Sequence, residues 1–95
     1  MVVKIIKVWA LEAHEYTDRI GKKQVFYSKG FTLQTGEGTF YAEVMGDNAK
    51  EIDKLDIKAQ DTAFVQVSVR AREYKAQNGT ERVSNEVTIQ QMYMI

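Results

Sequence analysis

Two stretches near the C-terminal end of the chain alternate between apolar and polar residues. Within Thr62–Tyr74, every second residue from Ala63 to Ala71 is apolar. Within Arg82–Met92, Val83, Val87 and Ile89 lie in a similar row between polar residues. This period indicates β-strands with one buried face and one face in water. Between them, Lys75–Glu81 contains Asn78-Gly79, which supplies the positive φ that a chain reversal needs. The pattern predicts an antiparallel hairpin whose apolar row is buried.

The N-terminal segment has a different pattern. Val2–Leu11 carries apolar residues on both parities, which is typical of a strand covered on both faces. In a small barrel only one face of a strand meets the core. We therefore expect the other face to meet a second subunit, giving at least a dimer through this first strand. The polar segment Glu12–Lys23 is expected to be a loop or the irregular end of a hairpin.

Two further strands are predicted at Gln24–Thr35 and Thr39–Met45, joined by a tight turn at residues 36–38. Gly30 lies inside the first of them, where glycine typically marks a bulge or a bend. A short helix should follow. It is expected to be capped by Asp47 or Asn48, and Asn48 with Glu51 resembles a capping box. Ile52 and Leu55 would form the apolar edge of this helix.

The predicted order is three strands, one helix and two strands. That is the order of an OB-fold, an all-β, five-stranded, partly open barrel with one short helix between strands 3 and 4. A β-sandwich is the alternative, and the single short helix favours the barrel. The length of 95 residues predicts one domain, residues 1–95. The phenylalanines are expected in its core: Phe26, Phe31, Phe40 and Phe64.

Composition excludes several kinds of chemistry. The chain has no cysteine and one histidine, His14, so we expect no disulfide, metal site or nucleophilic triad. We therefore predict no enzymatic activity and no cofactor. No segment has the length of a membrane span or the pattern of a signal peptide, so a cytoplasmic protein without membrane association is expected. The formal net charge is zero and gives no general attraction to nucleic acid.

Aromatic and cationic residues are nevertheless interleaved on the polar faces of the predicted strands. An OB barrel binds extended ligands across strands 2 and 3 and the adjoining loops. Rings that stack on bases, with cations that hold phosphates, suit a single nucleic-acid strand. The stacking candidates are Tyr27, Tyr41 and Tyr74, and the phosphate-binding candidates are Lys22, Lys23, Lys29, Arg70, Arg72, Lys75 and Arg82.

Each candidate also has a structural explanation. Tyr27 and Tyr41 could be cross-strand partners that stiffen the sheet. Arg70 and Arg72 could form surface ion pairs with glutamates, which usually contribute little to stability. Trp9 is more typical of a core or an interface than of a stacking platform.

The segment from Thr39 onward resembles the OB domain of bacterial single-stranded DNA-binding proteins. The resemblance is carried by Met45-Gly46, Ala49, Glu51, Gln60-Asp61, the Arg-x-Arg-x-aromatic run of Arg70, Arg72 and Tyr74, and then Arg82 and Glu86-Val87. It implies a fold and function of that kind, with Tyr74 as a stacking ring. The stacking tryptophan of the family falls near Thr39 here, where Phe40 is a shifted substitute, and the family's acidic tail is expected to be absent. Short, tail-less relatives of the primosomal replication protein N type bind single strands as dimers.

These observations predict a sequence-tolerant binder of single-stranded DNA that forms a homo-oligomer, either a dimer or a tetramer, in DNA replication or repair. Recruitment of a replication partner protein stays open. Two alternatives also stay open. One is an OB module for protein–protein contact that uses the first strand and the acidic helix. The other is a binder of single-stranded RNA, because stacking and phosphate contacts do not read the 2′-hydroxyl.

Overall fold

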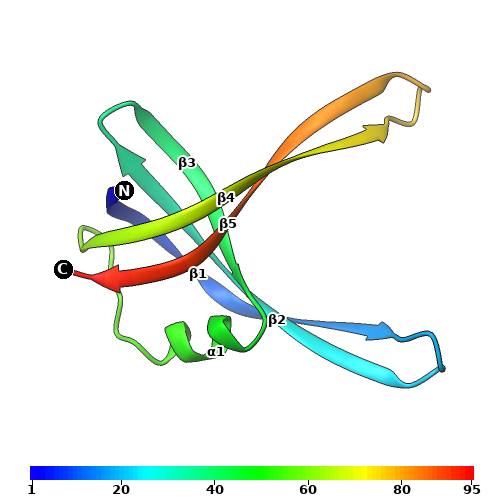
Figure 1. Ribbon diagram of the computed structural model, residues 1–95, viewed down its shortest axis with the longest axis horizontal. Coiled ribbons are helices and arrows are strands. Elements are labelled where there is room, and N and C mark those ends of the chain that lie inside the picture. The colour runs from blue at the N-terminus through cyan, green and yellow to red at the C-terminus, as the bar shows by residue number, and fades with distance from the viewer.

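The computed structural model describes all of residues 1–95 and shows a small barrel with two projecting hairpins (Figure 1). Its strands are β1 (Val2–Thr17), β2 (Lys23–Thr35), β3 (Gly38–Met45), β4 (Thr62–Lys75) and β5 (Glu81–Met94), and its helix is α1 (Asp47–Asp53). The sheet closes in the order β1-β2-β3-β5-β4. This topology confirms the predicted OB-like fold. No helix is long and apolar enough to cross a membrane.

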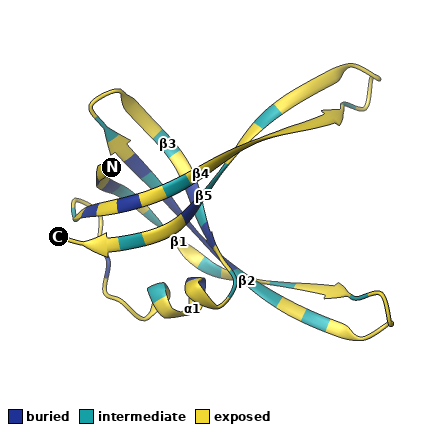
Figure 2. Ribbon diagram, in the orientation of Figure 1, coloured by how far each residue is buried: buried dark blue, intermediate teal, exposed yellow.

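The closed part of the barrel holds the core (Figure 2). Its largest fully buried side chains come from four strands, and α1 with the segment after it adds Ala49 and Ile57. Of the phenylalanines expected here, Phe31 is fully buried and Phe26 and Phe40 are half-buried. Phe64 was wrongly predicted, because it is 45% exposed. It lies outside the barrel between Val2 and Tyr93 of the neighbouring strands.

Two register shifts explain why the first strand is apolar on both parities. They lie between Ile5 and Lys7 and between Val8 and Leu11, opposite an unbroken β2. After each shift, the set of alternate residues that points toward the core changes from odd-numbered to even-numbered or back. Val8 and Leu11 therefore pack against the same core as Ile5. Inward packing around bulges thus accounts for these residues. Val2 and Trp9 of the same strand remain exposed, so a subunit contact through this strand stays a prediction.

Two hairpins, β1–β2 and β4–β5, extend beyond the closed barrel as two-stranded ribbons. Glu12–Thr17 pairs with Lys23–Ser28, and we call this pair the β1–β2 arm. Val69–Lys75 pairs with Glu81–Val87, and this pair is the β4–β5 arm. Figure 1 shows that the arms diverge from the barrel on the same side. Of the two alternatives expected for Glu12–Lys23, the end of a hairpin is the one observed, and residues 12–17 continue the strand.

The apolar row of the C-terminal hairpin is buried over only part of its length. Ala63 and Val65 are fully buried inside the barrel, but farther along Val69 is 65% and Val83 64% exposed. The prediction of one continuous buried face is therefore wrong for the β4–β5 arm. Alternation shows that a strand has an apolar face, but it does not show that another element covers that face.

The helix differs from its prediction in two respects. Gly46, with φ 74°, occupies the N-cap, and no side chain caps the helix. The cap predicted from Asp47 or Asn48 is therefore wrong. Leu55 lies beyond the end of α1 and is half-exposed, whereas Ala49 is the residue that α1 buries.

Candidate nucleic-acid interface

The outer face of the sheet carries a cluster of exposed rings where β1, β2 and β3 meet. Thr32 of β2 pairs with Tyr41 of β3, so both side chains lie on this face. The indole Nε1 of Trp9 donates a hydrogen bond to Thr32 Oγ1 at 3.1 Å. The rings of Trp9 and Tyr41 meet edge to face, with their centroids 5.9 Å apart. Trp9 is 41% and Tyr41 47% exposed.

More rings continue this outer face along the β1–β2 arm. His14 and Phe26 are paired across the strands and stack with centroids 4.7 Å apart and planes inclined by 24°. Tyr16 meets Phe26 at 5.8 Å. The imidazole Nε2 of His14 lies 2.8 Å from the hydroxyl of the buried Ser28, and this contact fixes the ring plane. The rings therefore form a track from the barrel out along the arm.

Charges of both signs border this aromatic track. The ammonium of Lys7 lies 3.8 Å from the centre of the Trp9 ring, a cation–π contact. Glu12 and Glu43 lie on the other side, near Tyr41. Partial burial, followed by the negative charges of Glu43 and Glu12, raises the pKa of the Tyr41 phenol above its ordinary value. Acidic side chains therefore lie near Tyr41, and a basic side chain lies beside Trp9.

The β4–β5 arm presents the predicted cations on one face. Arg72 is paired with Ser84 and Tyr74 with Arg82, and side chains of directly paired residues share a face of the ribbon. Arg70, two residues before Arg72, belongs to the same face. Arg72 makes a 3.3 Å ion pair with Glu86, and both side chains are exposed. The arginines and Tyr74 thus lie together in solvent, as the sequence predicted.

A groove of about 710 Å³ joins this cationic face to the aromatic track. Its lining includes Tyr41 and Met45 from β3 and Arg72 and Glu86 from the β4–β5 arm. Glu43 of β3 pairs with Thr88 of β5, so the outer faces of the two halves are continuous at this point. A chain lying on the outer face can therefore pass from the rings to the arginines.

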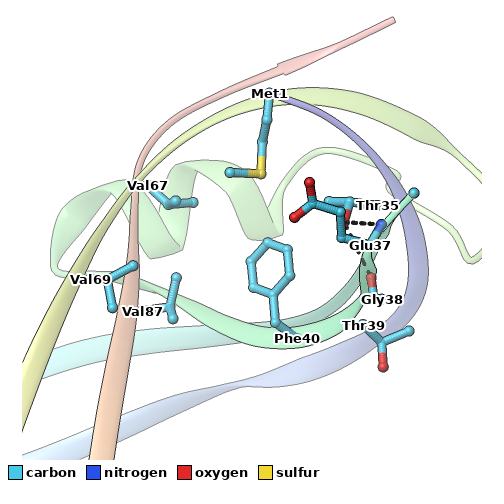
Figure 3. A pocket seen from close by; sticks show the side chains of 10 residues that line it. Met1, Thr35, Glu37, Gly38, Thr39, Phe40, Val67, Val69 and Val87 are labelled. Carbon is cyan, nitrogen blue, oxygen red and sulfur yellow. Dashed lines mark hydrogen bonds between the residues drawn. The ribbon is translucent and has the colours of Figure 1, made fainter.

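A second cavity of about 600 Å³ opens on the other side of the same region (Figure 3). Figure 3 shows the Phe40 ring between the Met1 side chain and a group of valines. Phe40, Val69 and Val87 line both this cavity and the groove, and we call the space they border the β3–β5 gap. It exists because β3 and β5 are paired at a single position, Glu43 with Thr88.

No protein-family model and no curated protein matches this chain. The resemblance to single-stranded DNA-binding proteins therefore stays a prediction. What supports a function is the arrangement of the side chains described above.

Two predicted contact residues face the wrong way. Lys29 is only 6% exposed, and its ammonium donates to Asp53 Oδ1 at 2.8 Å and to the Trp9 carbonyl at 2.9 Å. Tyr27 is half-buried and packs against the core, with the Lys50 ammonium 4.8 Å from its ring centre. Both predictions assumed that Gly30 changes the parity of β2. The pairing of β2 with β3 is regular through Gly30, so odd-numbered residues point inward along the strand.

The remaining predicted cations lie near the tips of the arms. Lys22 and Lys23 are exposed beside the turn of the β1–β2 arm, and Lys75 is exposed beside the turn of the other. A cavity of about 580 Å³ near the second turn is lined by residues that include Tyr74, Lys75 and Arg82. The structure therefore divides the predicted cations between the ends of two diverging arms.

Sequence reasoning missed several rings of the track: Trp9, His14, Tyr16 and Phe26. Three of them could have been found from the sequence. His14 and Tyr16 alternate with their neighbours after Glu12, and Phe26 belongs to the even-numbered residues of its strand. Trp9 could not be placed by parity, because it lies within a register shift of β1.

Proposed function

We propose that this protein is a non-catalytic, sequence-tolerant binder of single-stranded DNA, which lies on the outer face between the two arms. The observation that supports this most strongly is the row of rings on the outer face, with Trp9 and Tyr41 exposed at its centre. Exposed rings on a sheet surface are a stacking platform that any base can use, since every base has a π-face.

The track suits bases better than it suits phosphates. Stacking of one base on an aromatic side chain is worth about 1–3 kcal/mol. Glu12 and Glu43 sit beside the central rings, where they repel phosphates but can accept hydrogen bonds from amino groups of the bases. The bases therefore face the sheet, and the sugar–phosphate chain runs along the borders.

The borders hold the cations. Lys7 lies next to Trp9, while Arg70, Arg72 and Arg82 lie on the face of the β4–β5 arm. The tips of the arms add Lys22, Lys23 and Lys75. Lys29 and Tyr27 are not part of this proposal, because both are engaged with α1 or the core. Since the net charge of the chain is zero, we expect only a few phosphate contacts and a modest dependence on salt.

A titration with oligo-dT at several salt concentrations tests the proposal. The chain has one tryptophan, so the change in tryptophan fluorescence reports contact at Trp9. We expect quenching on binding and weaker binding at higher salt, with a slope of about −0.7 for each phosphate neutralised. Equal affinity for duplex DNA, or fluorescence that stays constant at saturation, would contradict the proposal. Oligo-U of the same length tests the RNA alternative, and clearly tighter binding to it would favour that alternative.

Two variants locate the interface. Trp9→Ala removes one stacking ring and should weaken oligo-dT binding by about tenfold or more, since tenfold corresponds to about 1.4 kcal/mol. Phe64→Ala removes an equally exposed ring that lies between Val2 and Tyr93, away from the track, and should leave affinity unchanged. An equal loss in both variants would show that the loss is not specific to the track.

A further inference from the structure

The β4–β5 arm has a free edge on β5. Residues 81–87 pair with β4 on one side, and β3 reaches β5 only at Thr88. The outward backbone N–H and C=O groups of these residues therefore have no partner strand. Natural edge strands are usually protected from pairing by lysine, proline or a bulge. The stretch Glu81–Val87 has no lysine, proline or bulge, and its charged residues, Glu81, Arg82 and Glu86, are of both signs.

The opposite edge of the same arm is protected. β4 is also free beyond its pairing with the start of β1, but there it carries Arg70, Arg72 and Lys75. An antiparallel copy of this edge centred on Ala71 would bring Arg70 against Arg72, and like charges directly opposite destabilise a sheet. The two edges of one ribbon thus differ in their ability to pair.

The inward-facing row of the arm also lacks a cover. Val69 and Val83 are about two-thirds exposed and point to the same side of the ribbon as the half-buried Val87. An isolated two-stranded ribbon is only marginally stable in water, and additional strands stabilise it. The arm therefore has both a free edge and an apolar face that further strands would cover.

We propose that β5 of this arm pairs antiparallel with β5 of a second copy of the chain, around a two-fold axis at Ser84. This register places Arg82 opposite Glu86 of the second copy, and Glu86 opposite Arg82 of the second copy. The edge is thus complementary in charge to itself, with two opposite-charge pairs of the kind that stabilise neighbouring strands. The result is a four-stranded ribbon made from two arms.

The same register covers the β3–β5 gap. Glu81 of the second copy lies opposite Val87, so the turn that precedes it comes next to Thr88, where β3 joins β5. That turn would enter the space bordered by Phe40, Val69 and Val87. The start of β1 offers no free edge for such a pairing, because it pairs with β4 and, from Lys4 onward, with β2.

Sedimentation analysis of the full chain with charge variants tests this pairing. The wild type should sediment with about twice the chain mass of 10.9 kDa. Arg82→Glu and Glu86→Arg each place like charges opposite one another and should shift the protein to monomer. The double variant Arg82→Glu/Glu86→Arg restores opposite charges and should recover the dimer. A monomeric wild type, or single variants that remain dimeric, would overturn the proposal.

Cross-linking provides a second test, in which the substitution on the proposed axis does not alter charge. Ser84 lies on the proposed axis, so Ser84→Cys places two thiols on directly opposed residues, within the range that a disulfide spans. The chain has no other cysteine, and mild oxidation should give a covalent dimer in high yield. Arg72→Cys is the matched control, because residue 72 pairs with Ser84 on the same face but belongs to the other strand. Equal cross-linking of both variants, or none at residue 84, would overturn the register.

Discussion

The Tyr41 ring lies directly against Gly30 of the neighbouring strand. A Cβ atom built on Gly30 would collide with the Tyr41 hydroxyl and would lie 2.6 Å from the ring atoms Cε2 and Cζ. Gly30 therefore leaves space for the Tyr41 ring, and it also lies opposite the register shift of β1 between Val8 and Leu11, while β2 stays regular against β3. The ring is held over the strand in contact with the edge of Trp9.

We expect Gly30→Ala to reduce DNA binding without unfolding the protein. The colliding atoms are at the far end of an exposed side chain, so Tyr41 can rotate away, and the stability cost should stay within about 1 kcal/mol. Rotation breaks the contact with Trp9 and disorders the centre of the track. Thermal unfolding and oligo-dT titration of the same sample measure the two effects. A large loss of stability with unchanged affinity would contradict this prediction.

Glu43→Gln should strengthen binding to oligo-dT. The substitution removes a negative charge beside Tyr41 and keeps a side chain of nearly the same shape. A phosphate passing the groove then meets less repulsion, and we expect an increase in affinity of a few-fold at low salt that fades at high salt. Asp56→Asn, which neutralises an exposed acid after α1, is the control and should have little effect.

Glu43→Gln should also change the titration of Tyr41 in the absence of DNA. Burial and the negative charges of Glu43 and Glu12 hold the pKa of Tyr41 above 10.0, its ordinary value. A raised pKa means that ionisation is harder in the folded state, so Tyr41 lowers stability as the pH rises above that ordinary value. Glu43→Gln should move the Tyr41 pKa downward and weaken this alkaline loss. Ultraviolet titration of the tyrosines in both proteins checks the shift.

The strand order and the helix position could be predicted because each depends on local periodicity. Five alternating segments and one short polar helix permit few closed arrangements, and the OB-like barrel is among them. The face of each residue was harder to predict. Along β4 the alternation continues without interruption, so Arg70, Arg72 and Tyr74 were correctly placed on one face.

Counting alternate residues gave the wrong face of the strand in two situations. In one the backbone is irregular, and in the other a change of parity was assumed where the strand is regular. β1 contains two register shifts, and Trp9, expected in a core or an interface, lies within one of them and is 41% exposed. In β2 the glycine suggested a change of parity, but the register shift at this position lies in β1 and leaves β2 regular. Lys29 and Tyr27 were therefore assigned to the wrong face. Glycine in a strand has two causes, a bend or the close approach of another group, and the sequence alone does not separate them.

Acid should loosen the turn of the β1–β2 arm. The Asp18 carboxylate accepts hydrogen bonds from the backbone N–H groups of Lys22 and Ile20 and from the Gln24 side chain. The Lys22 bond contributes most to lowering the pKa of Asp18 below 3.8, its ordinary value. Because the folded-state pKa is lowered, the turn is fully stabilised above 3.8 and loses this stabilisation as the pH falls through the lower value.

The amide resonances of Ile20 and Lys22 report this transition. Their shifts should titrate with a midpoint below 3.8, while amides in the barrel stay constant. Asp18→Asn keeps an acceptor oxygen but has no carboxylate to titrate, so the transition should disappear in that variant. A midpoint at or above the ordinary value would show that the carboxylate is not held as described.

The ion pair of the buried Lys29 and the exposed Asp53 should respond differently to the loss of each partner. Asp53→Ala leaves the Lys29 ammonium buried with only the Trp9 carbonyl as an acceptor. Leaving a buried charged donor short of a partner should cost about 1–3 kcal/mol. Lys29→Met removes the charge and fills the space with an apolar chain, which is often neutral or stabilising. Thermal unfolding of both variants should therefore show a clear loss for Asp53→Ala alone.

DNA titration of these variants separates structure from binding. Because the Lys29 ammonium points toward α1, Lys29→Met should leave affinity for oligo-dT and its salt dependence unchanged. Arg72→Ala removes an exposed cation from the arm and should weaken binding at low salt, with a shallower salt dependence. If Lys29→Met lost as much affinity as Arg72→Ala while remaining equally stable, the Lys29 ammonium would have to reach the DNA, and its assignment to the helix contact would be wrong.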